Sequence, residues 1–155
     1  MNNALFAPKK SLPAVEREAA QVQKEQTSHH DLTGSETILI VEDDDKVRNL
    51  VCEILEPQGY SILEAENGIE ALRVSEEHGD QIHLMIADVI MPKMGGGELA
   101  ERLRPLRPDM KVIYMSGYTN NAIVHHGILS PEMEFLQKPI SSEALKRKVR
   151  EVLDG

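Results

Sequence analysis

Short apolar segments recur along residues 37–155, separated by longer stretches in which apolar residues follow helical spacing. The clearest is Thr37–Val41, a continuous apolar run that stops at the four acidic residues 42–45. A run without polar alternation is typical of a strand buried on both faces of a parallel sheet. The predicted strands cover residues 37–41, 60–64, 83–87, 111–115 and 133–137.

The stretches between these segments predict amphipathic helices. Val47, Leu50 and Ile54 lie on one face of the first helix, which Pro57 should end. The predicted helices cover residues 46–56, 69–78, 98–103, 121–127 and 142–153. Strands that alternate with helices in five β-α units predict an α/β fold, in which helices cover both faces of a parallel sheet.

Residues 1–35 differ in composition from the rest of the chain. They hold two prolines and a long polar run, and their few apolar residues form a face too small to stabilise a helix alone. We therefore expect a linker or flexible tail over residues 1–35 and one folded domain over residues 36–155. His29 and His30 lie in this tail without metal-ligand partners at a fixed spacing, so we interpret them as solvated histidines.

Composition narrows the class of protein. The chain has 155 residues and a formal net charge of −9, which argues against direct binding to nucleic acid or to an anionic membrane. The single cysteine, Cys52, excludes an intrachain disulfide. No apolar stretch approaches the roughly 18 residues of a transmembrane helix, and the first residues lack a secretory leader pattern. We therefore expect a cytoplasmic protein without membrane contact by this segment.

Polar side chains follow four of the five predicted strands. Glu42 and Asp43 come after the first strand, Asp88 after the third, Ser116 after the fourth and Lys138 after the fifth. Right-handed crossovers place the carboxyl ends of all parallel strands on one edge of the sheet, where ligands of open α/β folds bind. The sequence therefore predicts that these five side chains gather at that edge.

The chemistry of this set indicates a phosphoryl-transfer site. Clustered carboxylates repel one another unless a cation joins them, and oxygen ligands suit Mg²⁺. Histidine and cysteine are absent from these positions, which disfavours zinc. A lysine and a hydroxyl can meet phosphoryl oxygens while a carboxylate accepts the group. The plainer alternative is that acidic residues such as Asp44 or Asp45 only cap the next helix.

Over residues 36–153 the sequence resembles the receiver domain of two-component response regulators. The matching motifs are ILIVEDD at residues 38–44, DVIMPKMGG at 88–96, YMSG at 114–117 and FLQKP at 135–139. The resemblance implies a flavodoxin-like (βα)5 fold with sheet order 2-1-3-4-5. It also implies phosphoryl transfer from phosphohistidine on a histidine kinase or histidine phosphotransfer domain, and both self-phosphorylation and autodephosphorylation.

The resemblance assigns the metal site and the phosphoacceptor. Asp88 matches the phosphoacceptor and is also a Mg²⁺ ligand in the family. Asp43 matches the direct metal ligand of the acidic pair, and Glu42 matches the residue that acts mostly through water. The backbone carbonyl of Ile90 completes the protein ligands.

The resemblance also assigns the switch. Ser116 matches the hydroxyl that turns toward the phosphoryl group, and Lys138 matches the lysine that pairs with it. Pro139 follows, often through a cis bond in this family, and Gly96 matches a small turn residue. The aromatic switch position holds Phe135, which lacks the hydroxyl of the tyrosine often found there. Switching would change the face formed by the fourth helix, fifth strand and fifth helix.

Several alternatives stay open. The domain could come from a hybrid histidine kinase, which the motif texture and the polar tail favour, or it could be a stand-alone regulator. A phosphohydrolase of the haloacid-dehalogenase type is a second alternative, but it would need an aspartate at the position of Ile90. A third alternative is a degenerate receiver, which would bind partners without being phosphorylated. His125 and His126 are interpreted as exposed helix residues rather than phosphoacceptors. The sequence leaves a homodimer open.

Overall fold

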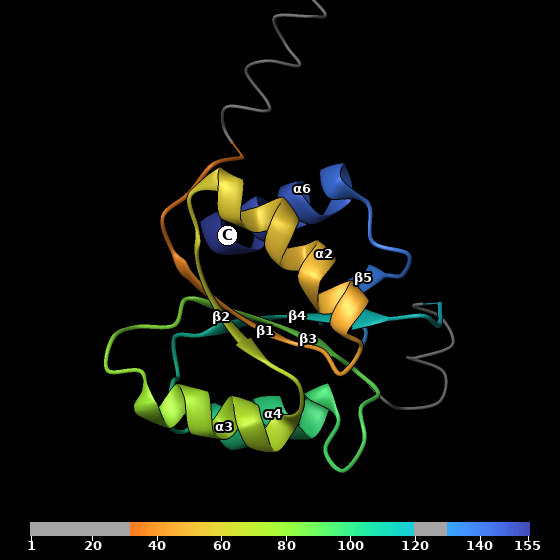
Figure 1. Cartoon of the computed structure of the whole chain (residues 1–155). Coiled ribbons are helices and arrows are strands. Elements are labelled where there is room, and N and C mark those ends of the chain that lie inside the picture. Colours follow the sequence, from red (N-terminus) through yellow and green to blue (C-terminus); the bar gives the residue numbers. More distant parts are fainter. Residues whose placement is uncertain (1–31, 120–129) are drawn as a thin grey trace, which may run out of the picture. The chain divides into compact units, whose positions relative to one another are not determined.

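A five-stranded parallel sheet lies at the centre of the computed structural model, which describes residues 32–119 and 130–155 (Figure 1). The strands run in the order β2-β1-β3-β4-β5, and every neighbouring pair is parallel. This confirms the predicted fold class and sheet order. The strands are β1 Thr37–Val41, β2 Ser61–Ala65, β3 Leu84–Asp88, β4 Lys111–Ser116 and β5 Glu134–Gln137.

Helices cover both faces of this sheet. The helices α2 and α6 lie over one face, and α3 and α4 lie over the other (Figure 1). The bounds are α2 Asp45–Leu55, α3 Gly68–Glu77, α4 Gly96–Leu103 and α6 Ser142–Asp154, with a short 3-10 turn at Glu56–Gln58. The predicted helix at 121–127 lies outside the described residues. Within the described part of the chain, no helix has the length and apolar character that crossing a membrane requires.

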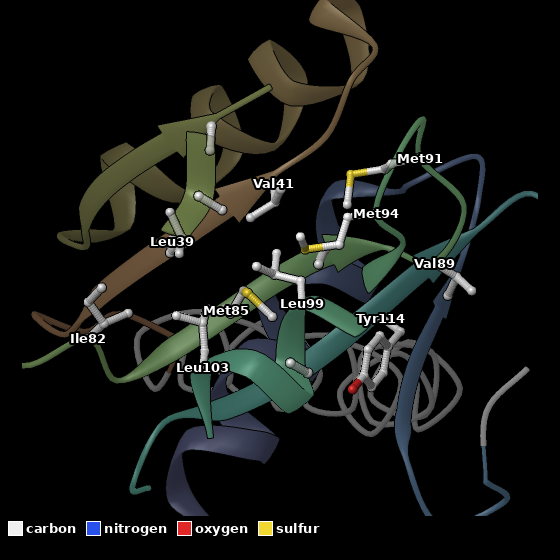
Figure 2. Close-up of a cluster of buried hydrophobic side chains, with 14 residues drawn as sticks. Leu39, Val41, Ile82, Met85, Val89, Met91, Met94, Leu99, Leu103 and Tyr114 are labelled. Atoms are coloured by element: carbon white, nitrogen blue, oxygen red, sulfur yellow. The ribbon is translucent and has the colours of Figure 1, made fainter. Parts of the chain in front are cut away.

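The apolar run of β1 supplies two separate cores. Leu39 and Val41 join the cluster on the side of α3 and α4, whereas Ile38 and Ile40 join the cluster on the side of α2 and α6. Because successive side chains of a strand point to opposite faces, a strand buried on both sides needs apolar residues at every position. Figure 2 shows the first cluster, in which Leu39, Leu99 and Tyr114 lie together with several methionines.

Side-chain caps fix where the helices begin. The Asp44 carboxylate accepts the Lys46 N–H at 2.9 Å and caps α2, so Asp44 rather than Asp45 has this role. Asn67 caps α3 by accepting the Glu70 N–H at 2.8 Å. Such caps satisfy backbone donors that have no partner inside the helix. The cap at Asp44 also holds the acidic loop after β1 against the start of α2.

Candidate functional site at the carboxyl edge of the sheet

The strands bring the expected residues to one edge. Asp88 is the last residue of β3 and pairs with Met115, which precedes Ser116 at the end of β4. Ser116 in turn pairs with Gln137, which precedes Lys138. The Lys138 N–H donates to the Ser116 carbonyl at 2.8 Å, so the backbone pairing continues into the site. The Lys138–Pro139 bond is cis, as the resemblance implied.

Lys138 bridges two acidic residues from different strands. Its Nζ lies 2.8 Å from Asp88 Oδ2, to which it donates a hydrogen bond, and 2.6 Å from Glu42 Oε1. The second contact is an ion pair with a buried carboxylate. The ammonium therefore ties the ends of β1, β3 and β5 together.

Three carboxylates share this corner. Ligand oxygens of Glu42, Asp43 and Asp88 all lie within 4.8 Å of one another. Glu42 and Asp88 are buried, while Asp43 is exposed. The ammonium of Lys138 supplies one positive charge against these carboxylates, so the corner carries an excess of negative charge.

Burial and crowding change the titration of this corner. Burial raises the pKa of Glu42 to about 7; Asp43 and Asp88 act in the same direction, while Lys138 and the Asp44 N–H oppose the shift. Burial disfavours the charge on Lys138, but its contacts with Asp88 and Glu42 outweigh that effect and raise its pKa above the ordinary value. The carboxylates thus hold the lysine protonated without being fully neutralised by it.

A hard divalent cation fits this donor set. Glu42 Oε1 is buried, and among the described residues it has no polar partner apart from the Lys138 ammonium. The acidic cluster offers only carboxylate oxygens, one of them on the exposed Asp43, which leaves a route for a hydrated ion. Mg²⁺ is commonly bound by one or two carboxylates together with waters and phosphate oxygens. The residues present are therefore suited to Mg²⁺.

The remaining predicted residues flank the corner. Ser116 is buried, and its Oγ accepts the Tyr118 N–H at 3.0 Å. The Ile90 N–H donates to Asp88 Oδ1 at 3.2 Å, while the Ile90 side chain is exposed. Phe135 lies on β5, pairs with Tyr114 and packs partly buried against the core on the side of α3 and α4.

Sequence reasoning did not single out Arg48. Its Nη1 donates to the Glu42 carbonyl at 2.7 Å, which places a guanidinium against the backbone of the acidic loop. The available signal was the spacing of Asp45 and Arg48 on the first turn of α2, where residues three apart are neighbours. That spacing does not reveal the contact with Glu42, because the loop conformation is not encoded in helical periodicity.

The site and the fold define a class of protein. The family model of the response regulator receiver domain matches residues 38–150, and the chain belongs to this family. Receiver domains of two-component systems interact with histidine kinases or phosphotransfer proteins, and they generally bind Mg²⁺.

Two relatives of known name show the range of proteins that carry this domain. The chain is 40% identical over 124 residues to the sensor kinase CckA of Brucella abortus (strain 2308). This match covers 80% of this chain but 13% of the kinase. It is 29% identical over 116 residues to the response regulator receiver protein CpdR of the same strain. This match covers 75% of this chain and 95% of CpdR. The chain thus spans a small part of the first relative and nearly all of the second.

A solved structure agrees with these sequence matches. The crystal structure of the receiver domain from the hybrid histidine kinase CckA superimposes with a TM-score of 0.64 at 37% sequence identity. The match covers 76% of this chain and 98% of that domain. The predicted resemblance to a receiver domain, and to that of a hybrid kinase in particular, is therefore confirmed.

Proposed function

We propose that this domain accepts a phosphoryl group on Asp88 from a phosphohistidine of a histidine kinase or histidine phosphotransfer domain, with Mg²⁺ bound by Asp43, Asp88, the Ile90 carbonyl and, through water, Glu42. The single observation that carries this proposal is the position of the Lys138 ammonium. It contacts both Asp88 and Glu42, beside the exposed Asp43. Phosphoryl transfer needs a carboxylate that accepts the group. It also needs positive charge on the phosphoryl oxygens, which an ammonium and a metal bound by the acidic cluster can supply.

The transfer is a displacement at phosphorus. A carboxylate oxygen of Asp88 forms the new O–P bond as the N–P bond of the phosphohistidine breaks, and the imidazole leaves. Bound Mg²⁺ supplies positive charge to the phosphoryl oxygens. Lys138 stays protonated and balances charge on the phosphoryl oxygens from the side of β5. In autodephosphorylation, water attacks the phosphorus of the acyl phosphate and the P–O bond to Asp88 breaks, which releases inorganic phosphate and restores the Asp88 carboxylate; the same residues support this step.

Ser116 and Phe135 couple this chemistry to a surface. The Ser116 hydroxyl turns from the Tyr118 N–H toward the phosphoryl group, and the loop after β4 follows. Phe135 then changes its packing, and the face that includes β5 and α6 is altered. Phe135 has no hydroxyl, so this switch works by packing alone.

Phosphorylation with acetyl phosphate tests the proposal. In the presence of Mg²⁺ the full chain should gain one phosphoryl group, detected by intact mass, and Asp88→Asn should gain none. Asp109→Asn is the matched control, because Asp109 is exposed in the turn before β4 and should not affect labelling. Labelling of Asp88→Asn at the wild-type level would contradict the assignment.

The parent protein is a further part of the proposal. The match to the CckA sensor kinase supports a receiver of a hybrid kinase, with residues 1–35 as the linker and residues 36–155 as the domain. The length match to CpdR supports the stand-alone alternative. An antibody against this domain, used on extracts of the source cells, should detect a kinase-sized protein. A band at the size of this chain would favour the stand-alone regulator.

A further inference from the structure

We propose that Arg48 is a positioning residue for the Mg²⁺ site, because it holds the peptide group that joins Glu42 to Asp43. This inference rests on the proposed function, since it concerns the same metal site. Arg48 lies on the first turn of α2, and its side chain is only 15% exposed. Among the described residues its polar contacts are with Glu42, Asp45 and Glu64 rather than with Asp88 or Lys138, so its effect on the metal passes through the acidic loop.

The guanidinium of Arg48 connects three separate segments. Nη1 donates to the Glu42 carbonyl at 2.7 Å, and Nη2 donates to Asp45 Oδ1 at 2.5 Å. Nε lies 3.5 Å from Glu64 Oε1 near the end of β2. A planar fork with donors in fixed directions can serve these acceptors together, which a single ammonium cannot do with the same geometry.

The contact with Glu42 determines the direction of the backbone into Asp43. The Glu42 carbonyl and the Asp43 N–H belong to one planar peptide unit, so holding the carbonyl orients that whole unit. The Glu42 N–H and Oε2 are engaged as well, because the N–H donates to the Ala65 carbonyl at 3.1 Å and Oε2 accepts the Asp44 N–H at 3.1 Å. Asp43 is exposed, and the orientation of this peptide unit sets where its side chain leaves the backbone.

The charge of Arg48 has partners of its own. Asp45 and Glu64 pair with the guanidinium on the side of α2 and β2. If Arg48 acted only through its charge, removing it would add negative potential near the site and strengthen Mg²⁺ binding. If Arg48 positions the loop, removing it weakens Mg²⁺ binding. The two roles therefore predict changes of opposite sign.

A Mg²⁺ titration of the full chain, followed by amide chemical shifts in NMR, separates these roles. Arg48→Ala and Arg48→Lys should each raise the Mg²⁺ dissociation constant about 10-fold, as is typical when a residue supporting a metal ligand is lost. Arg48→Lys keeps the charge and tests the fork alone. Arg73→Ala is the matched control, because Arg73 also bridges two acidic residues, Glu70 and Glu77, on the exposed face of α3. It should leave Mg²⁺ affinity unchanged.

A second readout needs no metal. In Mg²⁺-free buffer the Asp44 N–H, which donates to Glu42, should exchange with solvent faster in Arg48→Lys than in the wild type, at a temperature where both are folded. Wild-type affinity in Arg48→Lys, or tighter binding in Arg48→Ala, would overturn the positioning role. Failure of the wild type itself to bind Mg²⁺ would instead overturn the proposed function.

Discussion

At the scale of single residues, Lys138 balances the negative charge of two acidic residues. Its ammonium lies between Asp88 and Glu42, and Glu42 is fully buried. Removing one partner from such a group leaves a buried charge without compensation, which costs much more than losing a pair on the surface. The contribution of Lys138 to stability therefore depends on whether a cation occupies the same corner.

Lys138→Met should lower the free energy of unfolding by about 2–3 kcal/mol in Mg²⁺-free buffer, because Glu42 and Asp88 lose their counter-ion. Added Mg²⁺ should restore part of this loss. Urea denaturation with and without Mg²⁺ measures both effects.

Lys148→Met is the matched control for this substitution. Lys148 pairs with the half-exposed Glu134 at 2.8 Å, so its loss should cost no more than about 1 kcal/mol and should not respond to Mg²⁺. Equal losses for the two variants would show that the buried corner has no special need of Lys138.

At the scale of elements, the connection from β3 to α4 approaches the proposed phosphoacceptor closely. A Cβ on Gly96 would lie 2.5 Å from the Asp88 carbonyl oxygen and 3.3 Å from the Ala87 Cβ. The Gly96 N–H also donates to the Val89 carbonyl at 3.1 Å, so this turn cannot move away freely. This contact gives the physical reason for the small turn residue that the family resemblance implied.

Gly96→Ala should therefore destabilise the domain by about 1–3 kcal/mol, because the added methyl group forces the backbone of Asp88 to shift. Gly79→Ala is a suitable control, since a Cβ at Gly79 meets nothing within 4 Å. Thermal unfolding of the two variants beside the wild type measures the difference. A Gly96→Ala variant as stable as Gly79→Ala would mean that the turn relaxes without cost.

At the scale of the whole domain, an ion-pair network joins the residue just before β1 to the last helix. Arg150 of α6 contacts both carboxylate oxygens of Glu36, the Tyr60 hydroxyl and Asp154. Hydrogen bonds from Arg150 lower the pKa of Glu36 to about 2, against the opposing effect of burial. The network thus links segments more than a hundred positions apart at the edge opposite the candidate site.

The lowered pKa of Glu36 predicts an acid dependence of stability. Because the folded state holds Glu36 ionised more strongly than the unfolded state does, its contribution is complete above pH 4.5 and declines as the pH falls toward 2. Glu36→Gln should cost about 2–3 kcal/mol at pH 7 and progressively less below pH 4.5.

Urea denaturation at several pH values compares Glu36→Gln with the wild type and with Glu77→Gln. Glu77 pairs with Arg73 on an exposed face, where ion pairs contribute little. A difference between Glu36→Gln and the wild type that stays constant from pH 7 to pH 3 would contradict the role of the Glu36 ionisation.

Much of the fold follows from local pattern. The apolar run of β1 predicted burial on both faces, and the structure places its alternate side chains in two cores. Boundaries differ in detail: the second strand begins at Ser61 rather than Tyr60, shortly after the left-handed turn at Gly59. Tyr60 is buried, and its hydroxyl accepts a hydrogen bond from Arg150. A contact between residues 90 positions apart leaves no trace in the local pattern around Tyr60.

The sequence by itself determined which residue types stand at the carboxyl ends of the strands. It also predicted that they meet, because parallel pairing brings those ends to one edge. Only the tertiary structure decided how they meet there: Lys138 contacts Glu42 as well as Asp88, Glu42 is buried while Asp43 is exposed, and Arg48 holds the loop between them. Strand order and periodicity fix the neighbourhood of a side chain. Its partners depend on loop backbone and packing from elements distant in sequence, which no local pattern encodes.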